Sequence, residues 1–293
     1  MTILNFGSVN IDHVYRVAHL VRPGETIASS DYRQFSGGKG FNQSVALARA
    51  GASVCHAGRI GGDGVWLREQ LLADGADVQF LQIIDGPSGH AIIQVDAGGE
   101  NSIILFGGAN RTFTPEDARR ILDNFGAGDW LLLQNEISAM PEILRLAGER
   151  GLRVVFNPAP MGAAVLDYPL DGVSIFVLNE VEGEAFTGAN EAEAILAGMR
   201  SRFPDATVVL TLGAKGVIYD DGSQRIAVPA RKVEVVDTTA AGDTFIGYFL
   251  AGLSAGDDPQ IALETATRAA AICVTRPGAA PSIPRRGEVN GYQ

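Results

Sequence analysis

Cysteine is scarce in this chain of 293 residues: only Cys55 and Cys273 occur, far apart and each in an apolar context. This usage argues against a disulfide framework and fits reduced thiols in a cytosolic protein, so we expect both residues in the core. The four histidines, at positions 13, 19, 56 and 90, form neither an HExxH motif nor another paired metal spacing. The sequence therefore gives no sign of a structural zinc site.

Basic residues are also few, with 23 Lys and Arg against 34 Asp and Glu, which gives a net charge of −11. This balance disfavours nucleic acid and anionic membranes as partners, but it does not argue against ATP, because a local site can be positive on a negative protein. No 18-residue apolar run occurs, and Met1–Asn5 leads directly into a strand pattern instead of a signal peptide. We therefore expect no membrane span and a cytoplasmic protein.

Two common nucleotide-binding motifs are missing as well. The glycine-rich stretch 36–44 precedes an apolar helix pattern, but no Gly lies five residues before Gly38, and Lys39 is followed by Gly instead of Ser or Thr, so it is not a P-loop. Asn42 breaks the GxGxxG pattern, and Gly7-Ser8-Val9-Asn10 follows the first strand where a dinucleotide oxidoreductase would carry that motif. Taken alone, the glycine cluster indicates only a turn.

The chain does contain a long alternation of strand and helix patterns. Strands are predicted near 3–8, 54–58, 79–84, 130–133, 153–156, 175–178, 208–212 and 216–219, and helices near 44–50, 64–74, 140–150, 180–187, 191–203, 242–254 and 258–274. Such alternation predicts an α/β fold with a mostly parallel sheet covered on both faces. Short alternating runs broken by Pro23-Gly24, and a hairpin of 91–95 with 102–106, predict a small β appendage from residues 10–36 and 90–106 on a single domain, 1–293.

The stretch 235–245 has the most specific chemistry. Its β-branched run predicts a strand that ends at Asp237, followed by a turn of small residues and a helix that begins near Gly242. Such a helix start directs free amides and the positive end of the helix dipole at one point, which suits a phosphate. Asp243 lies in the first turn, where it either takes a proton from an incoming hydroxyl or simply caps the helix; this stretch alone makes the two equally plausible.

Polar residues also follow several of the predicted strands. Clusters begin at Gln134, Asn157, Asn179 and Thr211, and Asn10 and Asp12 lie two apart, on one face of an extended segment. Any one of these is explained by a turn or a cap, as in the capping box that Asn179 would form with Glu182. Because all of them fall at the carboxyl ends of predicted parallel strands, together they favour an active site.

At this point the sequence resembles the ribokinase (PfkB) family of carbohydrate kinases over nearly the whole chain. The two family signatures are Gly37-Gly38-Lys39-Gly40-Phe41-Asn42-Gln43 and Asp237-Thr238-Thr239-Ala240-Ala241-Gly242-Asp243-Thr244-Phe245, with further matches at 7–13, 23–26, 99–102 and 274–284. The resemblance implies a ribokinase-like three-layer α/β/α fold with a small β-sheet lid that also forms a homodimer contact. It implies an ATP-dependent sugar kinase that converts D-ribose to ribose 5-phosphate.

The resemblance also implies a set of site residues. Asp243 would be the general base, and Ala240, Ala241 and Gly242 with Asp243 would form the anion hole. The sugar would contact Asn10, Asp12, Gly38, Lys39, Asn42 and Glu136. The nucleotide would contact Asn179, Glu182, Thr211, Gly213, Lys215, Gly216 and Thr267, with Glu182 holding Mg²⁺ through water. Asp237, Thr239, Cys273, Arg276, Gly278 and Ser282 would surround a potassium ion, mostly through main-chain oxygens.

The chain departs from the family at Phe41, where ribokinases usually carry Ala. We expect this ring to lie beside the sugar and either to narrow the pocket or to displace the lid, which makes deoxyribose, a ketohexose or a nucleoside an alternative substrate. Pro277, Cys273 and the pair Thr267-Arg268 differ from common family residues near the cation and adenine sites. A catalytically silent sugar-binding regulator is a further alternative, but the intact Gly242-Asp243 pair argues against it.

Overall fold

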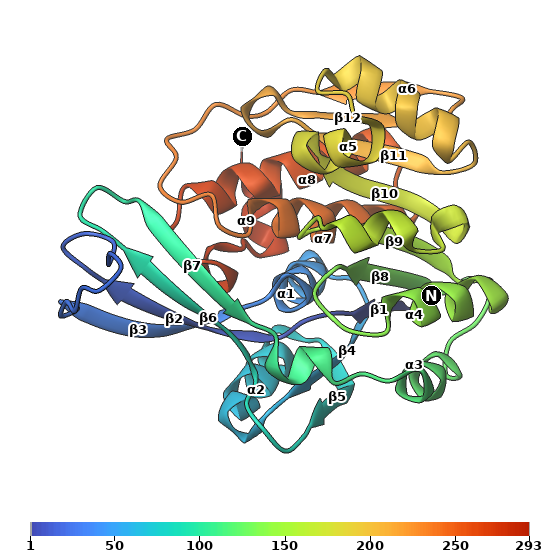
Figure 1. Cartoon of the computed structure of the whole chain (residues 1–293). Helices are drawn as coiled ribbons and strands as arrows, with labels where there is room; N and C mark the ends of the chain where they lie inside the picture. The colour runs from blue at the N-terminus through green and yellow to red at the C-terminus, as the bar shows by residue number, and fades with distance from the viewer. Residues whose placement is uncertain (1, 293) are drawn as a thin grey trace.

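This computed structural model describes residues 2–292, which form two β-sheets with helices around them (Figure 1). In spatial order the strands of the larger sheet are β13 (Arg225–Val228), β12 (Val217–Asp220), β11 (Thr207–Thr211), β10 (Val173–Asn179), β9 (Arg153–Asn157), β8 (Trp130–Gln134), β1 (Ile3–Phe6), β4 (Val54–Ile60) and β5 (Asp77–Ile83). From β11 to β5 all neighbours are parallel, and β12 and β13 extend one edge antiparallel. The predicted mostly parallel sheet is confirmed.

Helices cover both faces of this sheet and make two hydrophobic cores. One core joins the sheet to α1 (Lys39–Ala50), α2 (Val65–Asp74), α7 (Ala241–Ala255), α8 (Pro259–Val274) and α9 (Arg286–Gly291). The other joins its opposite face to α3 (Pro115–Leu122), α4 (Met140–Glu149), α5 (Glu180–Thr187) and α6 (Ala192–Arg202). The three-layer α/β/α arrangement follows from the strands, because a strand such as β8 is buried along its whole length and needs cover on both sides.

The smaller sheet extends from one side of the body (Figure 1). Its order is β3 (Asp31–Gly37), β2 (Asn10–Arg16), β6 (Gly89–Val95) and β7 (Asn101–Phe106), so the two segments predicted to form an appendage meet in one sheet. The pairs β2–β3 and β6–β7 are antiparallel, whereas β2 and β6 are parallel. Because β2 begins at Asn10, this residue and Asp12 belong to the smaller sheet, close to where the chain leaves the larger one.

Helices α1 and α7 pack unusually closely against each other. A Cβ added at Gly247 would lie 2.3 Å from the Cβ of Ala46, so only glycine allows this approach. On the other side of α1, a Cβ at Gly40 would lie 2.4 Å from the main-chain nitrogen of Ser8. Helix α1 is therefore held closely at two points, against the second turn of α7 at Ala46 and against the residues that follow β1 at Gly40.

The prediction of a strand that ends at Asp237 is wrong. The segment 229–240 has no strand, and Val235 and Val236 are 59% and 60% exposed. The amides of Val236 and Asp237 donate to the carbonyl of Val274, which attaches this segment to the end of α8 without forming a strand pair. A β-branched run predicts a strand only if a neighbouring strand is available, and here the run crosses the surface. Helices α3 and α9 and strand β13 were not predicted.

None of the described helices is long and apolar enough to cross a bilayer. Both cysteines are buried and free, as expected.

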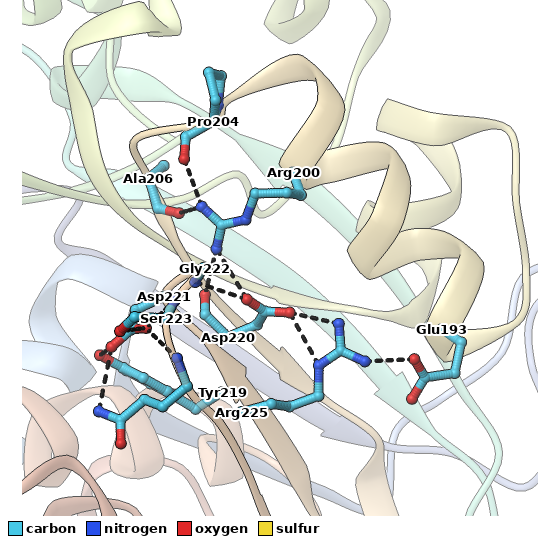
Figure 2. Close-up of polar contacts among 11 residues, drawn as sticks. Glu193, Arg200, Pro204, Ala206, Tyr219, Asp220, Asp221, Gly222, Ser223 and Arg225 are labelled. Atoms are coloured by element: carbon cyan, nitrogen blue, oxygen red, sulfur yellow. Dashed lines mark hydrogen bonds and ion pairs between the residues drawn. The ribbon is translucent and has the colours of Figure 1, made fainter.

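A network of charged side chains links the antiparallel edge strands β12 and β13 to α6 (Figure 2). The carboxylate of Asp220 accepts from Arg200 at 3.0 Å through Oδ1 and from Arg225 at 2.9 Å through Oδ2. Arg200 also donates to the carbonyls of Pro204 and Ala206, at the turn between α6 and β11. Asp220 is 8% exposed, so it is the shared and least solvated member of the network.

Replacing Asp220 by Ala should destabilise the fold by about 2 kcal/mol, because it leaves two arginines without their common partner in a partly buried position. Chemical denaturation followed by circular dichroism measures this change.

Glu193→Ala is the matched control, because the side chain of Glu193 is 73% exposed at the outer end of the same network, where it contacts Arg225. This variant should change the free energy of unfolding by less than about 0.5 kcal/mol. Equal effects of the two substitutions would contradict the central role given to Asp220.

Candidate active site

The predicted polar clusters lie together at the carboxyl ends of four neighbouring strands of the larger sheet. Strands β8, β9, β10 and β11 are neighbours, and they end at Gln134, Asn157, Asn179 and Thr211. Since these strands are parallel, their carboxyl ends point the same way and bring the four polar residues to one side. The site predicted from these clusters is therefore assembled at the position where open α/β sheets bind ligands.

The N-terminus of α7 lies beside these strand ends, and it has no side-chain cap. Its N-cap residue is Ala240, which has a left-handed backbone (φ 61°, ψ 10°) and no side-chain acceptor. A non-glycine residue in this region costs about 1 kcal/mol or more, which the surrounding turn must offset. The amide of Ala241 donates to the carbonyl of Thr238 at 3.2 Å, whereas the amides of Gly242 and Asp243 have no acceptor among the described residues, so these two are available to an anion.

Asp243, in the first turn of α7, does not cap its own helix. Its Oδ1 accepts a hydrogen bond from Nε2 of Gln43 at 2.8 Å, and its Oδ2 accepts from Nδ2 of Asn42 at 3.1 Å. Both donors belong to α1. The side chain is 7% exposed, yet it lines a cavity of about 200 Å³. This arrangement excludes the capping interpretation and leaves a carboxylate beside the uncapped helix start.

The cavity brings together residues from both signatures and from three strands. Of the predicted residues, Lys39, Asn179, Glu182, Thr211, Ala240, Ala241, Gly242 and Asp243 line it. Its wall also includes Asn157 and Thr238, and the apolar Ile246. A helix N-terminus, an amine and two carboxylates therefore share one small volume.

Lys39 supplies the positive charge of this cavity. Neighbouring Asp243, and to a lesser extent Glu136 and Glu182, raise the pKa of Lys39 above its usual value despite its burial. The ammonium group is therefore charged near neutral pH, although it is largely removed from water. Notably, the sequence assigned Lys39 to the sugar, whereas the structure also puts it beside the anion site.

Glu182 opens α5 and has two roles in the geometry. It forms the predicted capping box with Asn179: the Glu182 amide donates to Asn179 Oδ1 at 2.9 Å, and the Asn179 amide donates to Glu182 Oε2 at 2.9 Å. It is also 7% exposed and lines the cavity. Burial raises the pKa of this carboxyl group. The geometry of this pair therefore fits both interpretations, a helix cap and a ligand-binding group at the cavity wall.

The predicted sugar residues lie where the smaller sheet joins α1. Asn10 is buried, and its Oδ1 accepts from Nδ2 of Asn110 at 2.7 Å. The carboxyl group of Asp12 lies across Gly37, where an added Cβ would come within 2.2 Å of it. Burial, together with the nearby Glu136, raises the pKa of Asp12 to about 7.

Two groups at the start of α1 complete this part of the site. Glu136 Oε2 accepts from the amide of Lys39 at 2.9 Å and from the hydroxyl of Ser8. Gly38 precedes the helix with a positive φ of 88°. Asn42 uses its Nδ2 on Asp243, but its Oδ1 is buried with no hydrogen-bond partner. An unpaired buried acceptor next to a carboxylate suits a ligand hydroxyl.

Of the predicted nucleotide residues, only Asn179, Glu182 and Thr211 line the cavity. Thr211 lines the cavity, and Gly213–Lys215 forms a short 3₁₀ turn just after it, with Gly216 next in the chain at φ 111°. The side chain of Lys215 is 77% exposed and contacts Glu180 at 3.5 Å. Thr267, on α8, is 8% exposed, and its Oγ1 has no hydrogen-bond partner.

The predicted potassium residues come from the loop before α7 and from the end of α8 with the segment after it, and these two regions contact each other. Asp237 Oδ2 accepts from the amide of Gly278 at 2.8 Å, and its Oδ1 accepts from the amide of Thr239 at 2.9 Å. Cys273 Sγ lies 3.0 Å from Ser282 Oγ and 3.7 Å from the carbonyl of Thr239. The side chain of Arg276 turns to Glu288 instead.

Apart from Cys273 Sγ, the atoms in this region that could bind a cation are carboxylate, hydroxyl and carbonyl oxygens, which suit a hard cation. Over residues 2–292 there is no cluster of three or more His, Cys, Asp or Glu side chains suited to a transition metal.

Phe41 requires a correction. Its ring is 0% exposed and belongs to the core between the sheet and α1, so the expectation that it lies beside the sugar is wrong. In a helix that begins at Lys39, position 41 lies on a different side from Asn42, and it faces the sheet. The replacement therefore fills the core and gives no reason to expect a narrowed pocket.

Sequence reasoning missed three residues that the structure brings to the site. Gln43 and Asn157 were noticed in their motifs but were given no role, and Asn110, which holds Asn10, was not noticed at all. Gln43 lies directly beside Asn42 in the signature, and that adjacency is the one signal that pointed to it. Nothing in the sequence links Asn110 to position 10, because the contact joins distant segments.

Comparison with known proteins agrees with this geometry. The model of the pfkB family carbohydrate kinases matches residues 2–286. A ribokinase from Haemophilus influenzae is 38% identical, and the match covers 98% of this chain and 96% of that protein.

Two solved structures have the same fold. Ribokinase from Cryptococcus neoformans in complex with ADP has a TM-score of 0.86 at 37% identity, covering 100% of this chain and 99% of that one. Ribokinase from Arabidopsis thaliana complexed with ribose and ATP has a TM-score of 0.86 at 29% identity, covering 99% and 97%. With a family match over nearly its whole length and relatives of this similarity, the chain belongs to the pfkB family and is a carbohydrate kinase.

Proposed function

We propose that this kinase transfers the γ-phosphoryl group of ATP to the 5-hydroxymethyl oxygen of D-ribose, giving ribose 5-phosphate and ADP. The observation that carries the proposal is the shared cavity in which Asp243 lies beside the uncapped start of α7. The relatives named ribokinase support the choice of sugar, and the complexes of such enzymes with ADP, ribose and ATP support both ligands.

The chemistry follows from this arrangement. Asp243 accepts the proton as the O–H bond of the sugar hydroxymethyl group breaks, and the freed oxygen forms a bond to the γ-phosphorus in line with the bond to ADP. That bond breaks, and its electron pair leaves on the β-phosphate oxygen. The amides of Gly242 and Asp243, presented by the turn at Ala240 and Ala241, and the ammonium group of Lys39 offset the negative charge on the moving group.

Sugar binding is assigned to residues around the start of α1. Asn42 Oδ1 is a free acceptor, and the Asp12 carboxyl group has room over Gly37. These groups can receive the hydroxyl protons of a pentose in a direction fixed by the backbone. The full set proposed for the sugar is Asn10, Asp12, Gly38, Lys39, Asn42 and Glu136.

The nucleotide is assigned to the opposite part of the cavity, formed by the ends of β10 and β11. Asn179, Glu182, Thr211, Gly213, Lys215, Gly216 and Thr267 make up the proposed set. Glu182 and Asn179 are oxygen donors at the cavity wall, which fits Mg²⁺ held through water. When bound, Mg²⁺ would offset charge on the phosphate oxygens; Glu182 would position it, and the helix amides would still hold the moving group.

A potassium ion is assigned to the loops beside the helix start, with Asp237, Thr239, Cys273, Arg276, Gly278 and Ser282 around it. The fit rests on the carboxylate of Asp237, which is bound to both loops, and on the main-chain oxygens near it. A monovalent cation there would strengthen the positive field at the anion hole. The chain's own part is to hold residues 237–239 against 278 and so to fix the turn at Ala240.

A coupled ADP-release assay tests the function. With MgATP and K⁺ we expect turnover on D-ribose above that on other pentoses, hexoses and nucleosides, and lower turnover when K⁺ is omitted. Asp243→Asn should lower kcat by about 10² to 10⁴, the usual contribution of a general base, while the dissociation constant for ribose changes little.

The outcomes separate substrate from mechanism. Turnover of a nucleoside with inert ribose would overturn the substrate but leave the family. Near-normal kcat in Asp243→Asn would remove this carboxylate from the reaction.

The pKa of Asp12 gives a pH dependence. Its pKa is raised to about 7, so at pH 6 the carboxyl group is mostly protonated and has lost acceptor capacity. We expect kcat/KM for ribose to rise as the pH increases through about 7 and then to level off. Initial rates at low ribose and saturating MgATP, between pH 5.5 and 9, measure this. Asp12→Asn should raise KM and flatten the rise; an unchanged rise would assign it to another group.

We also propose that the smaller sheet is a lid over the sugar and that it pairs two copies of the chain. Its outer strand β7 exposes consecutive apolar side chains: Ile103, Ile104, Leu105 and Phe106 are each at least 50% exposed. An apolar edge strand of this kind is rarely left uncovered in a monomer. The faces alternate along the strand, so both sides of the sheet have apolar residues to bury.

The double variant Ile104→Asp/Leu105→Asp, which places one charge on each face of β7, should convert a dimer to a monomer. Light scattering after gel filtration should give twice the chain mass of 30.8 kDa for the unaltered protein and 30.8 kDa for the variant. Ile261→Asp is the control, because Ile261 is 55% exposed on α8, outside the sheet. A monomeric unaltered protein would refute the pairing.

A further inference from the structure

A chain of buried amide side chains leads from Asp243 into the interior of the protein. Gln43 donates to Asp243 Oδ1 at 2.8 Å, and its own Oε1 accepts from Nε2 of Gln134 at 2.6 Å. Gln134 Nε2 in turn donates to Oδ1 of Asn5 at 2.9 Å. Gln43, Gln134 and Asn5 are all 0% exposed. Neither Gln134 nor Asn5 lines the cavity, so this chain is separate from the groups that touch the ligands.

Each amide in the chain is held in one orientation, because the inner end of the chain is a backbone carbonyl. Asn5 Nδ2 donates to the carbonyl of Gly40 at 2.7 Å, an atom that can only accept, and also to Ser44 Oγ at 2.8 Å. The Oδ1 of Asn5 must therefore face Gln134, and Gln134 must donate to it with Nε2. That nitrogen then requires the oxygen end of Gln43. The NH₂ end of Gln43 is left to point at Asp243.

A second backbone carbonyl enforces the same orientation independently. Asn157 Nδ2 donates to the carbonyl of Val177 at 3.0 Å, which turns Asn157 Oδ1 toward Gln43 Nε2 at 3.3 Å. If the Gln43 amide were flipped, its oxygen would face the oxygens of both Asn157 and Asp243. Two anchors, on α1 and on β10, thus prevent Gln43 from reversing.

The other oxygen of Asp243 has no comparable support. Its partner, Asn42 Nδ2, is more distant at 3.1 Å, and the opposite end of the Asn42 amide is buried without a partner. No backbone carbonyl fixes Asn42 among the contacts of residues 2–292. Asn42 is therefore the adaptable neighbour and Gln43 the fixed one.

We propose that Gln43 is a positioning residue: its locked amide holds Oδ1 of Asp243, so that Oδ2 is the oxygen that faces the acceptor hydroxyl and takes its proton. This inference rests on the proposed function, because it concerns the base of that reaction. Gln43 thus keeps the base oriented toward the acceptor.

Gln43→Glu tests the proposal. A carboxylate at position 43 would lie close to Asp243 Oδ1, where the amide nitrogen now lies at 2.8 Å, so the two acids would compete for one proton. We expect the acid limb of the kcat–pH profile to move up by about one pH unit or more, and kcat at pH 7 to fall about tenfold or more. KM for the sugar and for MgATP should stay within about threefold.

Gln134→Glu is the second variant and does not touch Asp243. With acceptors only at position 134, Gln43 Oε1 loses its donor, and the amide is held toward Asp243 only by the longer contact of its Nε2 with Asn157 Oδ1 at 3.3 Å, so its grip on Asp243 Oδ1 weakens. The acid limb should again move up. This variant also keeps the proposal testable if Gln43→Glu does not fold, as judged by circular dichroism and gel filtration.

Ser44→Ala is the matched control at the inner end of the chain. Ser44 is 0% exposed and accepts from Asn5, but the Gly40 carbonyl still fixes Asn5 without it. We expect a lower melting temperature and an unmoved acid limb. If the Gln43 and Gln134 variants also lose stability without moving the limb, the residues are only structural and the proposal is overturned.

The Asp243→Asn result separates this inference from the proposed function. Loss of turnover in Asp243→Asn together with an unmoved limb in Gln43→Glu refutes the positioning role alone. Retained turnover in Asp243→Asn refutes the base itself, and the positioning role falls with it.

Discussion

The site depends on a helix that begins without a cap beside a carboxylate that does not cap it. An Asp three residues into a helix would ordinarily bond to nearby amides of that helix and use up the groups that attract an anion. Here Ala240 occupies the N-cap, and both oxygens of Asp243 are bound by side chains of α1. Because another helix holds the acid, the amides stay available to a phosphoryl group. The proposed base and the proposed anion hole therefore lie in one place.

This separation requires α1 and α7 to lie closer than side chains normally permit. Gly247 is one turn after Asp243, and an added Cβ there would collide with Ala46. At larger helix spacing, amides as short as those of Asn42 and Gln43 would not reach the carboxylate. The close contact between the helices is thus a condition for the chemistry as well as for the core. It also explains why the first turn of α1, which follows the smaller sheet directly, can bring the residues proposed to bind the sugar to the same acid.

The electrostatics of the cavity are local. The chain has a net charge of −11, yet a largely buried lysine and the start of a helix supply positive potential where the phosphates would lie. The carboxylates around Lys39 raise its pKa and keep it protonated, and Lys39 in turn partly offsets the rise that burial causes in the pKa of Glu182. Removing water from the cavity lowers the local dielectric constant, which strengthens the attraction between Lys39 and these carboxylates. A lid over the sugar would add to it and would also keep water from competing as the acceptor.

The sequence predicted the parts of the fold that depend on local pattern, and it failed where a contact between distant segments decides. The buried strands, α7 and the polar strand ends follow from periodicity and small-residue turns, so all three were predictable. Val235 and Val236 have strand-forming side chains but no neighbouring strand, and Phe41 lies next to a sugar residue in sequence yet faces the core. Gln43 illustrates the same limit at the site. Its identity was visible in the signature, but its role requires the direction of the amides of Gln134, Asn5 and Asn157, which is set by two backbone carbonyls on separate elements. Such directional information exists only once the fold has formed, so a motif can name the residues of a site without revealing how one of them is aimed.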